Sequence, residues 1–145
     1  MQIIWGAFKD DREAIITNSK NIGFLTGEEN REMLNAHYVG TMIVGEPFRV
    51  PTSDDLYDFG VAGLTEKVYQ ILPTMSKHRL TPPPEEVYSL HKKIIGTYLM
   101  CIKLKAKVPA RKTLEETYEQ WKKLHSAEFY ARQQNGESEE DVPAE

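Results

Sequence analysis

The hydrophobic positions along this chain recur mainly at intervals of three and four residues, the spacing of one face of an α-helix. The clearest stripe lies toward the C-terminal end and consists of Leu114, Tyr118, Trp121 and His125. No stretch shows the strict alternation of apolar and polar residues that a half-buried β-strand requires. The pattern therefore predicts an all-α fold of about six helices.

Two short helices are expected at the start of the chain. Residues 2–9 (QIIWGAFK) are apolar and helical in character. Asp10 can cap the next helix, with Glu13 in the reciprocal position of a capping box. Gly23 is a suitable C-terminal stop for that second helix, because glycine readily takes the left-handed conformation found there.

A third helix is predicted from the next capping signal. Thr26 and Glu29 repeat the capping-box spacing, and the hydrophobic periodicity continues to about Val44. Gly45 and Pro47 follow and are expected to end the helix.

The longest loop is expected at residues 46–63, which contain several prolines, glycines and aspartates. Thr65 is predicted to cap a fourth helix after this loop. Pro73 lacks a backbone N–H, so the fourth helix is expected to kink or stop near Leu72.

The fifth predicted helix follows three consecutive prolines at 82–84, which force an extended approach, and Pro84 suits the first helical position. From Ile94 to Ile102 the helix is apolar nearly all round, so we expect it to be the buried centre of the fold. Gly96 within it suggests a close contact with another helix.

A sixth helix is predicted to begin with the capping box of Thr113 and Glu116 and to run to about Gln134. Residues 1–134 then form one helical unit. Residues 135–145 hold five acids and no base and are predicted to be a disordered, solubilising tail.

The charge distribution argues against nucleic-acid binding. The net charge of −4 comes largely from the tail, because removing its five acids from the total of 22 leaves 17 acids against 18 bases. A nucleic-acid binder would show a clearly basic body. The N-terminus shows no signal or transit peptide, and no apolar stretch approaches the ~20 residues of a membrane span.

The string Asp-Phe-Gly at residues 58–60 has the letters of the magnesium-binding motif of protein kinases. Neither a catalytic loop nor a glycine-rich phosphate loop precedes it. We therefore interpret it as a turn, in which Asp58 and Gly60 supply the geometry.

The remaining candidate residues do not form a predicted metal or catalytic site. The histidines are too far apart in sequence to suggest a metal site; they are His37, His78, His91 and His125. His91 is interpreted as a hydrogen-bonded core or boundary residue rather than a catalytic base. Cys101 lies in an apolar run, cannot form an internal disulfide and is expected to be unreactive. The basic cluster at 103–112 is read as helix-end charge in preference to a site for anionic lipid or phosphate.

Residues 78–96 (HRLTPPPEEVYSLHKKIIG), followed by Cys101 and the KLKAKVP of 103–109, resemble the end of the UbiB-type (aarF-domain) atypical kinases. The resemblance is strongest to the mitochondrial branch that supports ubiquinone biosynthesis. It covers nearly everything from Gln2 to about Tyr118. Further matching segments, in family order, are DREA (11–14), FLTG (24–27), AH (36–37), YDFG (57–60) and TEK (65–67). The chain departs from the family pattern at Ile95 and Ala110, which implies altered local packing.

This resemblance implies a protein-kinase-like fold that binds Mg-ATP and works at the matrix face of the inner mitochondrial membrane. The family's ATP-contacting lysine, its Lys-x-Gly-Gln extension, its catalytic loop and its metal-binding Asp-Phe-Gly all lie upstream of the helix that matches 2–9. Residues 1–134 would then be part of a helical C-lobe, and Asp58 would match a later position in that lobe. No catalytic, cofactor-binding or metal-binding residue is expected in this chain.

Two hypotheses about function remain. In the first, the chain is the C-terminal helical part of an atypical kinase or ATPase and buttresses the catalytic lobe. Its partners would be the upstream part of that domain, with ubiquinone-biosynthesis proteins and the inner-membrane surface as further candidates. In the second, it is a stand-alone helical adaptor that binds protein or lipid without ATP. Under the first hypothesis, the first helix is expected to expose Ile3, Ile4, Trp5 and Phe8.

Overall fold

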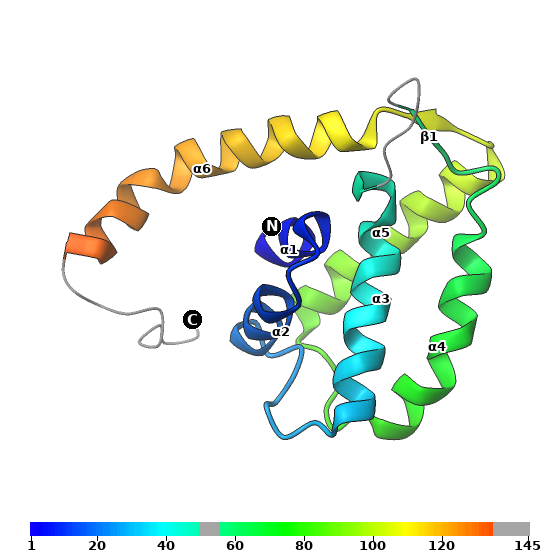
Figure 1. Ribbon diagram of the computed structural model, residues 1–145, viewed down its shortest axis with the longest axis horizontal. Helices are drawn as coiled ribbons and strands as arrows, with labels where there is room; N and C mark the ends of the chain where they lie inside the picture. The colour runs from blue at the N-terminus through cyan, green and yellow to red at the C-terminus, as the bar shows by residue number, and fades with distance from the viewer. Residues whose placement is uncertain (50–55, 135–145) are drawn as a thin grey trace.

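The structure, a computed structural model, describes residues 1–49 and 56–134, with side chains described as far as residue 126. Within these residues it contains six helices and one pair of very short strands, so the all-α prediction is confirmed (Figure 1). The elements are α1 Gln2–Lys9, α2 Arg12–Asn21, α3 Arg31–Arg49, β1 Tyr57–Asp58, α4 Leu64–His78, α5 Glu85–Lys103, β2 Lys107–Val108 and α6 Ala110–Gln134. Residues 50–55 and the acidic tail lie outside the described part.

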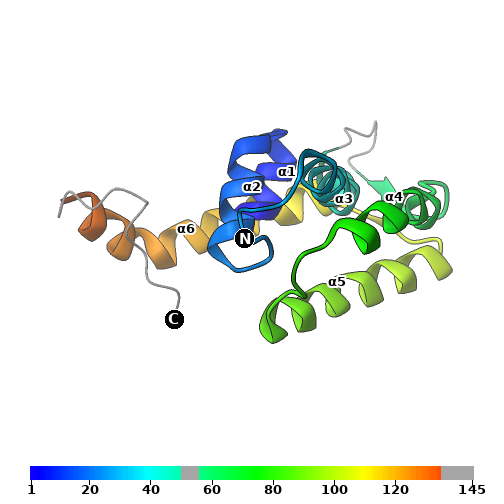
Figure 2. The same ribbon diagram turned by 90° about the horizontal axis from the view of Figure 1, so that it is seen from below.

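Helix α3 is the centre of the arrangement. It packs closely against α1 on one side and α4 on the other, while α2 packs against α1. Helix α5 crosses behind α3 in Figure 1 and runs along the lower side of the group in Figure 2, while α6 crosses above α1 in Figure 1 before its far half leaves the body. None of the helices within the described residues is long and apolar enough to cross a membrane.

The two strands were not predicted, because each is only two residues long and cannot show an alternating pattern. They pair antiparallel, with Tyr57 opposite Val108. This pair brings the segment before α4 against the segment before α6.

The start of α2 differs from the prediction by one residue. Asp11 is the N-cap, and its Oδ1 accepts a hydrogen bond from the Ala14 amide at 2.9 Å. Asp10 instead closes α1 in the left-handed conformation, with φ of 60°. Gly23 follows α2 with φ of +68°, as predicted.

Helix α3 begins later and ends later than predicted. The Glu29 carboxylate accepts hydrogen bonds from the Thr26 and Gly27 amides and so closes a loop rather than a helix turn. Asn30 caps the helix through Met33 N at 2.8 Å. The helix continues through Gly45 and Pro47, because both are buried against neighbouring segments and packing outweighs their low helix propensity.

The predicted caps of α4 and α6 and the predicted end of α4 near Leu72 are wrong. Helix α4 begins after Gly63 rather than at a Thr65 cap and passes through Pro73 to His78. Helix α6 begins at Ala110, before the predicted capping box, and Thr113 donates its hydroxyl to Pro109 O instead. Its end at Gln134 agrees with the prediction.

The core lies in two places. Where α1, α2 and α3 meet, Ala7, Ile15 and Met33 are almost fully buried. Around the strand pair, Phe59 is 3% exposed and its ring meets those of Tyr57 and Tyr98 edge to face at 4.9 and 5.3 Å. The second group links β1, the start of α4 and the end of α5.

The prediction for α5 is wrong. Pro84 does approach in an extended conformation, as the N-cap rather than the first helical residue, but no residue of α5 is buried. Leu99 is 52% exposed and Met100 is 63% exposed. A Cβ added at Gly96 would meet nothing within 4 Å, so the expected close contact is absent within the described residues.

The prediction for α1 is also wrong. Its apolar side chains are partly covered rather than exposed, because α6 lies across them. Trp5 stacks on Tyr118 of the predicted α6 stripe, with ring centroids 3.7 Å apart. The Arg111 guanidinium lies over Phe8 at 5.3 Å. Among the described residues, α5 instead carries several exposed large apolar side chains, including those of Ile95, Leu99 and Met100.

Candidate functional site

The Asp-Phe-Gly string forms the turn that the sequence predicts. Asp58 Oδ1 accepts a hydrogen bond from the Gly60 amide at 2.8 Å. The other carboxylate oxygen pairs with Lys107 Nζ at 3.4 Å across the strand pair. Both oxygens of Asp58 thus hold local structure.

The histidines lie in separate surroundings. His78 bridges Asn30 Nδ2 at 3.0 Å and Glu32 at 3.0 Å, tying the end of α4 to the start of α3. His125 stacks on Trp121 along α6. Within the described residues, no group of three His, Cys, Asp or Glu side chains could hold a metal ion.

Two histidines and an arginine meet around one aromatic ring, in a cluster we call the Arg79 junction. It consists of Phe24, His37, Arg79 and His91, with Ser19 beneath His37. The Phe24 ring lies 4.9 Å from the His37 ring, 6.1 Å from the His91 ring and 4.9 Å from the Arg79 Cζ. The junction joins α2, α3, the end of α4 and α5.

His37 is held neutral within this junction. The Ser19 hydroxyl donates to Ile15 O at 2.7 Å, so it accepts from His37 Nε2 at 2.8 Å, which places the histidine proton on Nε2. His37 is only 4% exposed. Burial, together with the positive charge of Arg79, lowers the pKa of His37 to about 4. Burial, and then Arg79, also lowers the pKa of His91.

This arrangement makes stability depend on pH. The unfolded state binds a proton at His37 near pH ~6.5, whereas the folded state does so only near pH 4. The contribution of neutral His37 to the free energy of unfolding is therefore fully present above pH ~6.5 and is lost as the pH falls toward 4. The expected loss between pH ~7 and ~5 is about 2 kcal/mol.

Urea titrations at the two pH values measure this loss. His37→Gln keeps a donor for Ser19 but cannot be protonated, so the difference should become smaller in that variant, and His91, whose pKa is also lowered, should account for part of what remains. His125→Gln is the matched control, because His125 is exposed, and it should retain the full difference. An equal pH dependence of the unmodified chain and the His37 variant would contradict the assignment.

Arg79 is the residue of this junction that the sequence analysis missed. It caps the end of α4 in an extended conformation, and its side chain turns over Phe24. Its Nε and Nη2 are buried and have no hydrogen-bond partner among the described residues. The signal available was its place in the stretch 78–96 that carries the family resemblance. The lack of an acceptor is visible only in three dimensions.

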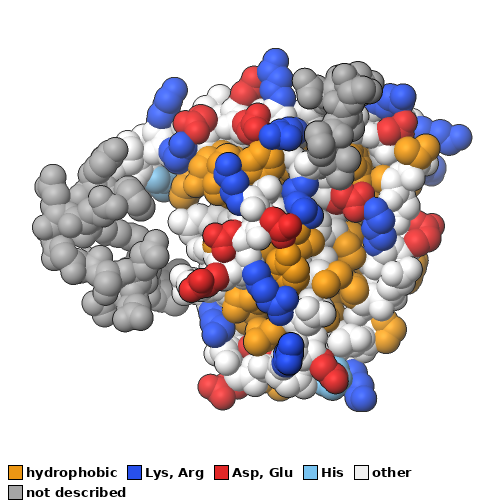
Figure 3. All heavy atoms as spheres, in the orientation of Figure 1, with side chains coloured by type: hydrophobic (Ala, Val, Ile, Leu, Met, Phe, Trp, Pro, Cys, Tyr) orange, Lys and Arg blue, Asp and Glu red, His pale blue; other side chains and the backbone are white. Residues whose placement is uncertain are grey.

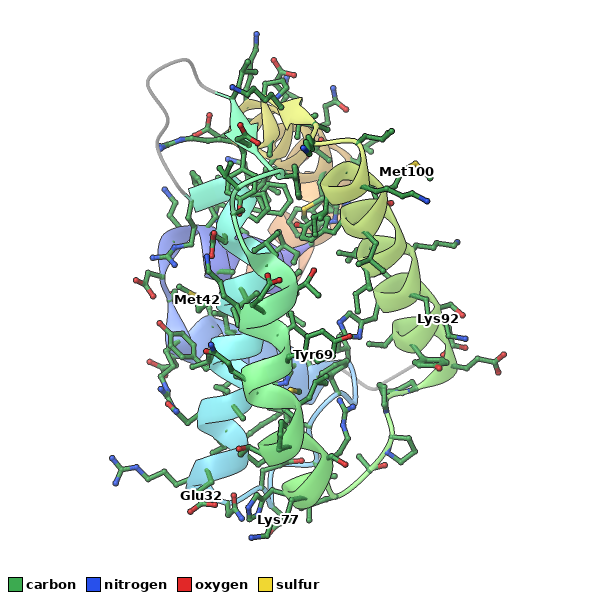
Figure 4. The ribbon with its side chains drawn as sticks, turned by 90° about the vertical axis from the view of Figure 1, so that its right-hand side faces the viewer. Glu32, Met42, Tyr69, Lys77, Lys92 and Met100 are labelled. Atoms are coloured by element: carbon green, nitrogen blue, oxygen red, sulfur yellow. The ribbon has the colours of Figure 1, made fainter. Side chains whose placement is uncertain are left out.

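The second candidate feature is an uncovered apolar stripe on α5. Tyr88, Ile95 and Leu99 are spaced seven and four residues apart, so they share one face of the helix, and all are exposed. We call these three residues the α5 stripe. Figure 4 shows Lys92 and Met100 pointing away from the other helices, which places this side of α5 outward.

The opposite side of α5 borders a shallow apolar groove of about 240 Å³. It is lined by Ile4, Phe48, Lys93, Ile94, Thr97 and Tyr98. Tyr98 anchors this side, because its hydroxyl donates to Val44 O at 2.7 Å. This hydrogen bond fixes the C-terminal half of α5 to α3. On the face shown in Figure 3, hydrophobic and charged side chains are interspersed over α3 and α4.

Similar proteins come from several distant organisms. The chain is 42% identical over 121 residues to "Atypical kinase coq-8, mitochondrial" of Caenorhabditis elegans. It is 39% identical over 123 residues to "Atypical kinase COQ8B, mitochondrial" of Danio rerio, and 36% identical over 108 residues to "Atypical kinase COQ8, mitochondrial" of Saccharomyces cerevisiae. These matches cover 83%, 85% and 74% of this chain but only 16%, 19% and 21% of the relatives. No protein-family model matches the chain.

Proposed function

Because the chain belongs by homology to the UbiB-type atypical kinases of mitochondria, we propose that it forms the C-terminal helical part of a kinase-like domain. That domain supports ubiquinone (coenzyme Q) biosynthesis at the matrix face of the inner mitochondrial membrane. The role of this part is structural: it buttresses the lobe that carries the catalytic residues. Its further partners are ubiquinone-biosynthesis proteins and the membrane surface.

The observation that carries this proposal is the uncovered α5. A helical segment that is apolar nearly all round, as residues 94–102 of α5 are, normally lies inside a protein, yet no residue of α5 is buried. The chain spans about a fifth of the length of the curated relatives it matches. A larger domain therefore has ample chain to cover the α5 stripe, and exposed apolar surface of this kind usually marks a missing interface.

Mg-ATP would be held by the upstream part of such a domain. Nucleotide binding by a kinase-like fold needs a phosphate-covering loop, a lysine and carboxylates that hold magnesium. Asp58 does not fit this role, because its oxygens are engaged by Gly60 and Lys107. The chain thus contributes packing to the cleft rather than ligands for the nucleotide.

The chain alone is expected to show no change in melting temperature with Mg-ATP. A ligand at about 100 times its dissociation constant would stabilise the native state by ~2.7 kcal/mol, which is easily detected by differential scanning fluorimetry. A clear shift that is lost in Asp58→Asn would contradict this expectation and assign nucleotide binding to the turn.

Association with the upstream part tests the proposal directly. The upstream region of the Caenorhabditis elegans relative should bind the chain, and Leu99→Asp should weaken that binding at least about tenfold, because it buries an unpaired carboxylate. Leu124→Asp, at a 79% exposed position on α6, is the matched control and should leave binding unchanged. Failure of the unmodified chain to bind would reject the proposal.

A hybrid protein tests the link to ubiquinone. The chain should replace the matched segment of the Saccharomyces cerevisiae relative and maintain the ubiquinone content of cells that lack their own copy. Deletion of this segment from the relative should abolish ubiquinone production in the same cells. A hybrid that folds but yields no ubiquinone would show that the chain does not perform this role.

A further inference from the structure

Arg79 brings a positive charge into the Arg79 junction, and none of the described residues forms a salt bridge with it. Its Nε and Nη2, which form the edge of the guanidinium best suited to a bidentate contact, are shielded from solvent. Neither atom has an acceptor among the described residues. The Arg79 Cζ lies over the Phe24 ring, 4.9 Å from its centroid.

The neighbouring groups do not compensate this charge. His37 and His91 are neutral near pH ~7, and a neutral imidazole does not supply a negative charge. Glu29 is close enough to influence His37, but its carboxylate is engaged at 2.7 to 2.9 Å by Thr26 and Gly27. Shielded N–H groups of a cation that lack an acceptor lower the stability of a fold.

We propose that Arg79 is a docking residue that pairs with an Asp or Glu side chain of the upstream kinase-like part. This inference rests on the proposed function and names the chemistry of the contact. The planar guanidinium matches a carboxylate in a bidentate pair. Phe24 holds its plane, and the side chain as a whole is partly exposed, so a carboxylate from outside can reach it after a small rotation.

The position of Arg79 suits one partner that covers both candidate features. Arg79 lies in the connection that leads from α4 into α5, the helix that carries the α5 stripe. That connection is fixed against the end of α2, where a Cβ added at Gly23 would stand 3.1 Å from Pro84 Cγ. A segment that packs on α5 therefore passes close to Arg79.

The proposal predicts effects of opposite sign for one substitution. Arg79→Met keeps a similar volume and removes the unpaired charge, so the melting temperature of the chain alone should rise by several degrees. The same substitution should weaken binding of the upstream region of the Caenorhabditis elegans relative at least about tenfold. A purely structural arginine would shift both measurements in the same direction.

Arg111→Met is the matched control. The Arg111 guanidinium also lies over an aromatic ring, that of Phe8, but it already pairs with Glu115 at 3.4 Å. Its replacement should change neither the melting temperature nor the binding appreciably. Destabilisation of the chain by Arg79→Met, or unchanged binding, would overturn the inference. Absence of binding by the unmodified chain would instead reject the proposed function, and the inference with it.

The variant Arg79→Lys can identify the partner carboxylate by cross-linking. It also provides a test of the inference if Arg79→Met does not fold. A carbodiimide joins a lysine amine to a carboxylate that touches it, and mass spectrometry of the complex then locates the bond. A cross-link from residue 79 to an Asp or Glu of the upstream region is the expected result. A cross-link to Glu29, or none in a complex that has formed, would overturn the inference.

Discussion

Replacing Phe59 with alanine is expected to lower the free energy of unfolding by about 3–5 kcal/mol. Phe59 is 3% exposed and lies between the rings of Tyr57 and Tyr98. Its loss would leave a cavity where β1, α4 and α5 meet, and it would also remove the aromatic contact that anchors α5. Domains are typically stable by only 5–15 kcal/mol, so the variant would lose a large share of its stability.

Urea denaturation followed by circular dichroism measures this loss. Tyr69→Ala is the matched control, because Tyr69 is an aromatic residue that is 67% exposed on α4. Its substitution should cost less than about 1 kcal/mol. Equal losses in the two variants would contradict the placement of the core at the strand pair.

Replacing Gly45 with leucine is expected to destabilise the chain by about 3 kcal/mol or more. A Cβ at this position would stand 2.5 Å from the Cβ of Ala7, closer than two such atoms can approach. The substitution must therefore push α1 away from α3. Leucine is a better helix former than glycine by close to 1 kcal/mol, and this gain is too small to offset the clash.

The same substitution at Gly96 is the control. A Cβ there meets nothing within 4 Å, so Gly96→Leu should stabilise the chain alone through helix propensity, by up to about 1 kcal/mol. Thermal melts of the two variants should thus move in opposite directions. A destabilised Gly96 variant would mean that α5 is packed more closely than the structure has it.

The hydrophobic spacing predicted the helices well because a repeat of three to four residues depends on the chain alone. The first helix was predicted with its observed bounds. The predicted stripe of α6 does form a packing face, because Tyr118 of that stripe stacks on Trp5. The caps were less predictable. Asp10 and Asp11 are adjacent, and only the left-handed backbone at Asp10 decides which of them starts α2.

The errors at Gly45 and in α5 have a common physical origin. Propensity marks Gly45 as a helix end, but the approach of α1 requires a residue without a side chain inside α3. In α5, the apolar sequence shows that the helix needs cover without showing which segment provides it. In both cases the outcome depends on which segments pack against the helix, and the local sequence pattern does not show this.

The Arg79 junction could be predicted only in part. The sequence suggested that His91 is a boundary residue, which agrees with its partial burial. The convergence of Phe24, His37 and Arg79 depends on contacts between segments far apart in the chain, and an unpaired guanidinium has no sequence signature.

Hydrogen–deuterium exchange across α5 tests the central claim, that this helix is covered by the rest of a kinase-like domain. The chain would be measured alone and in the presence of the upstream region of the Caenorhabditis elegans relative. We expect amides around Ile95 and Leu99 to exchange at least about tenfold more slowly in the complex, and amides beyond Leu124 in α6 to be unchanged. Unchanged exchange in α5 in a complex that has formed would contradict it.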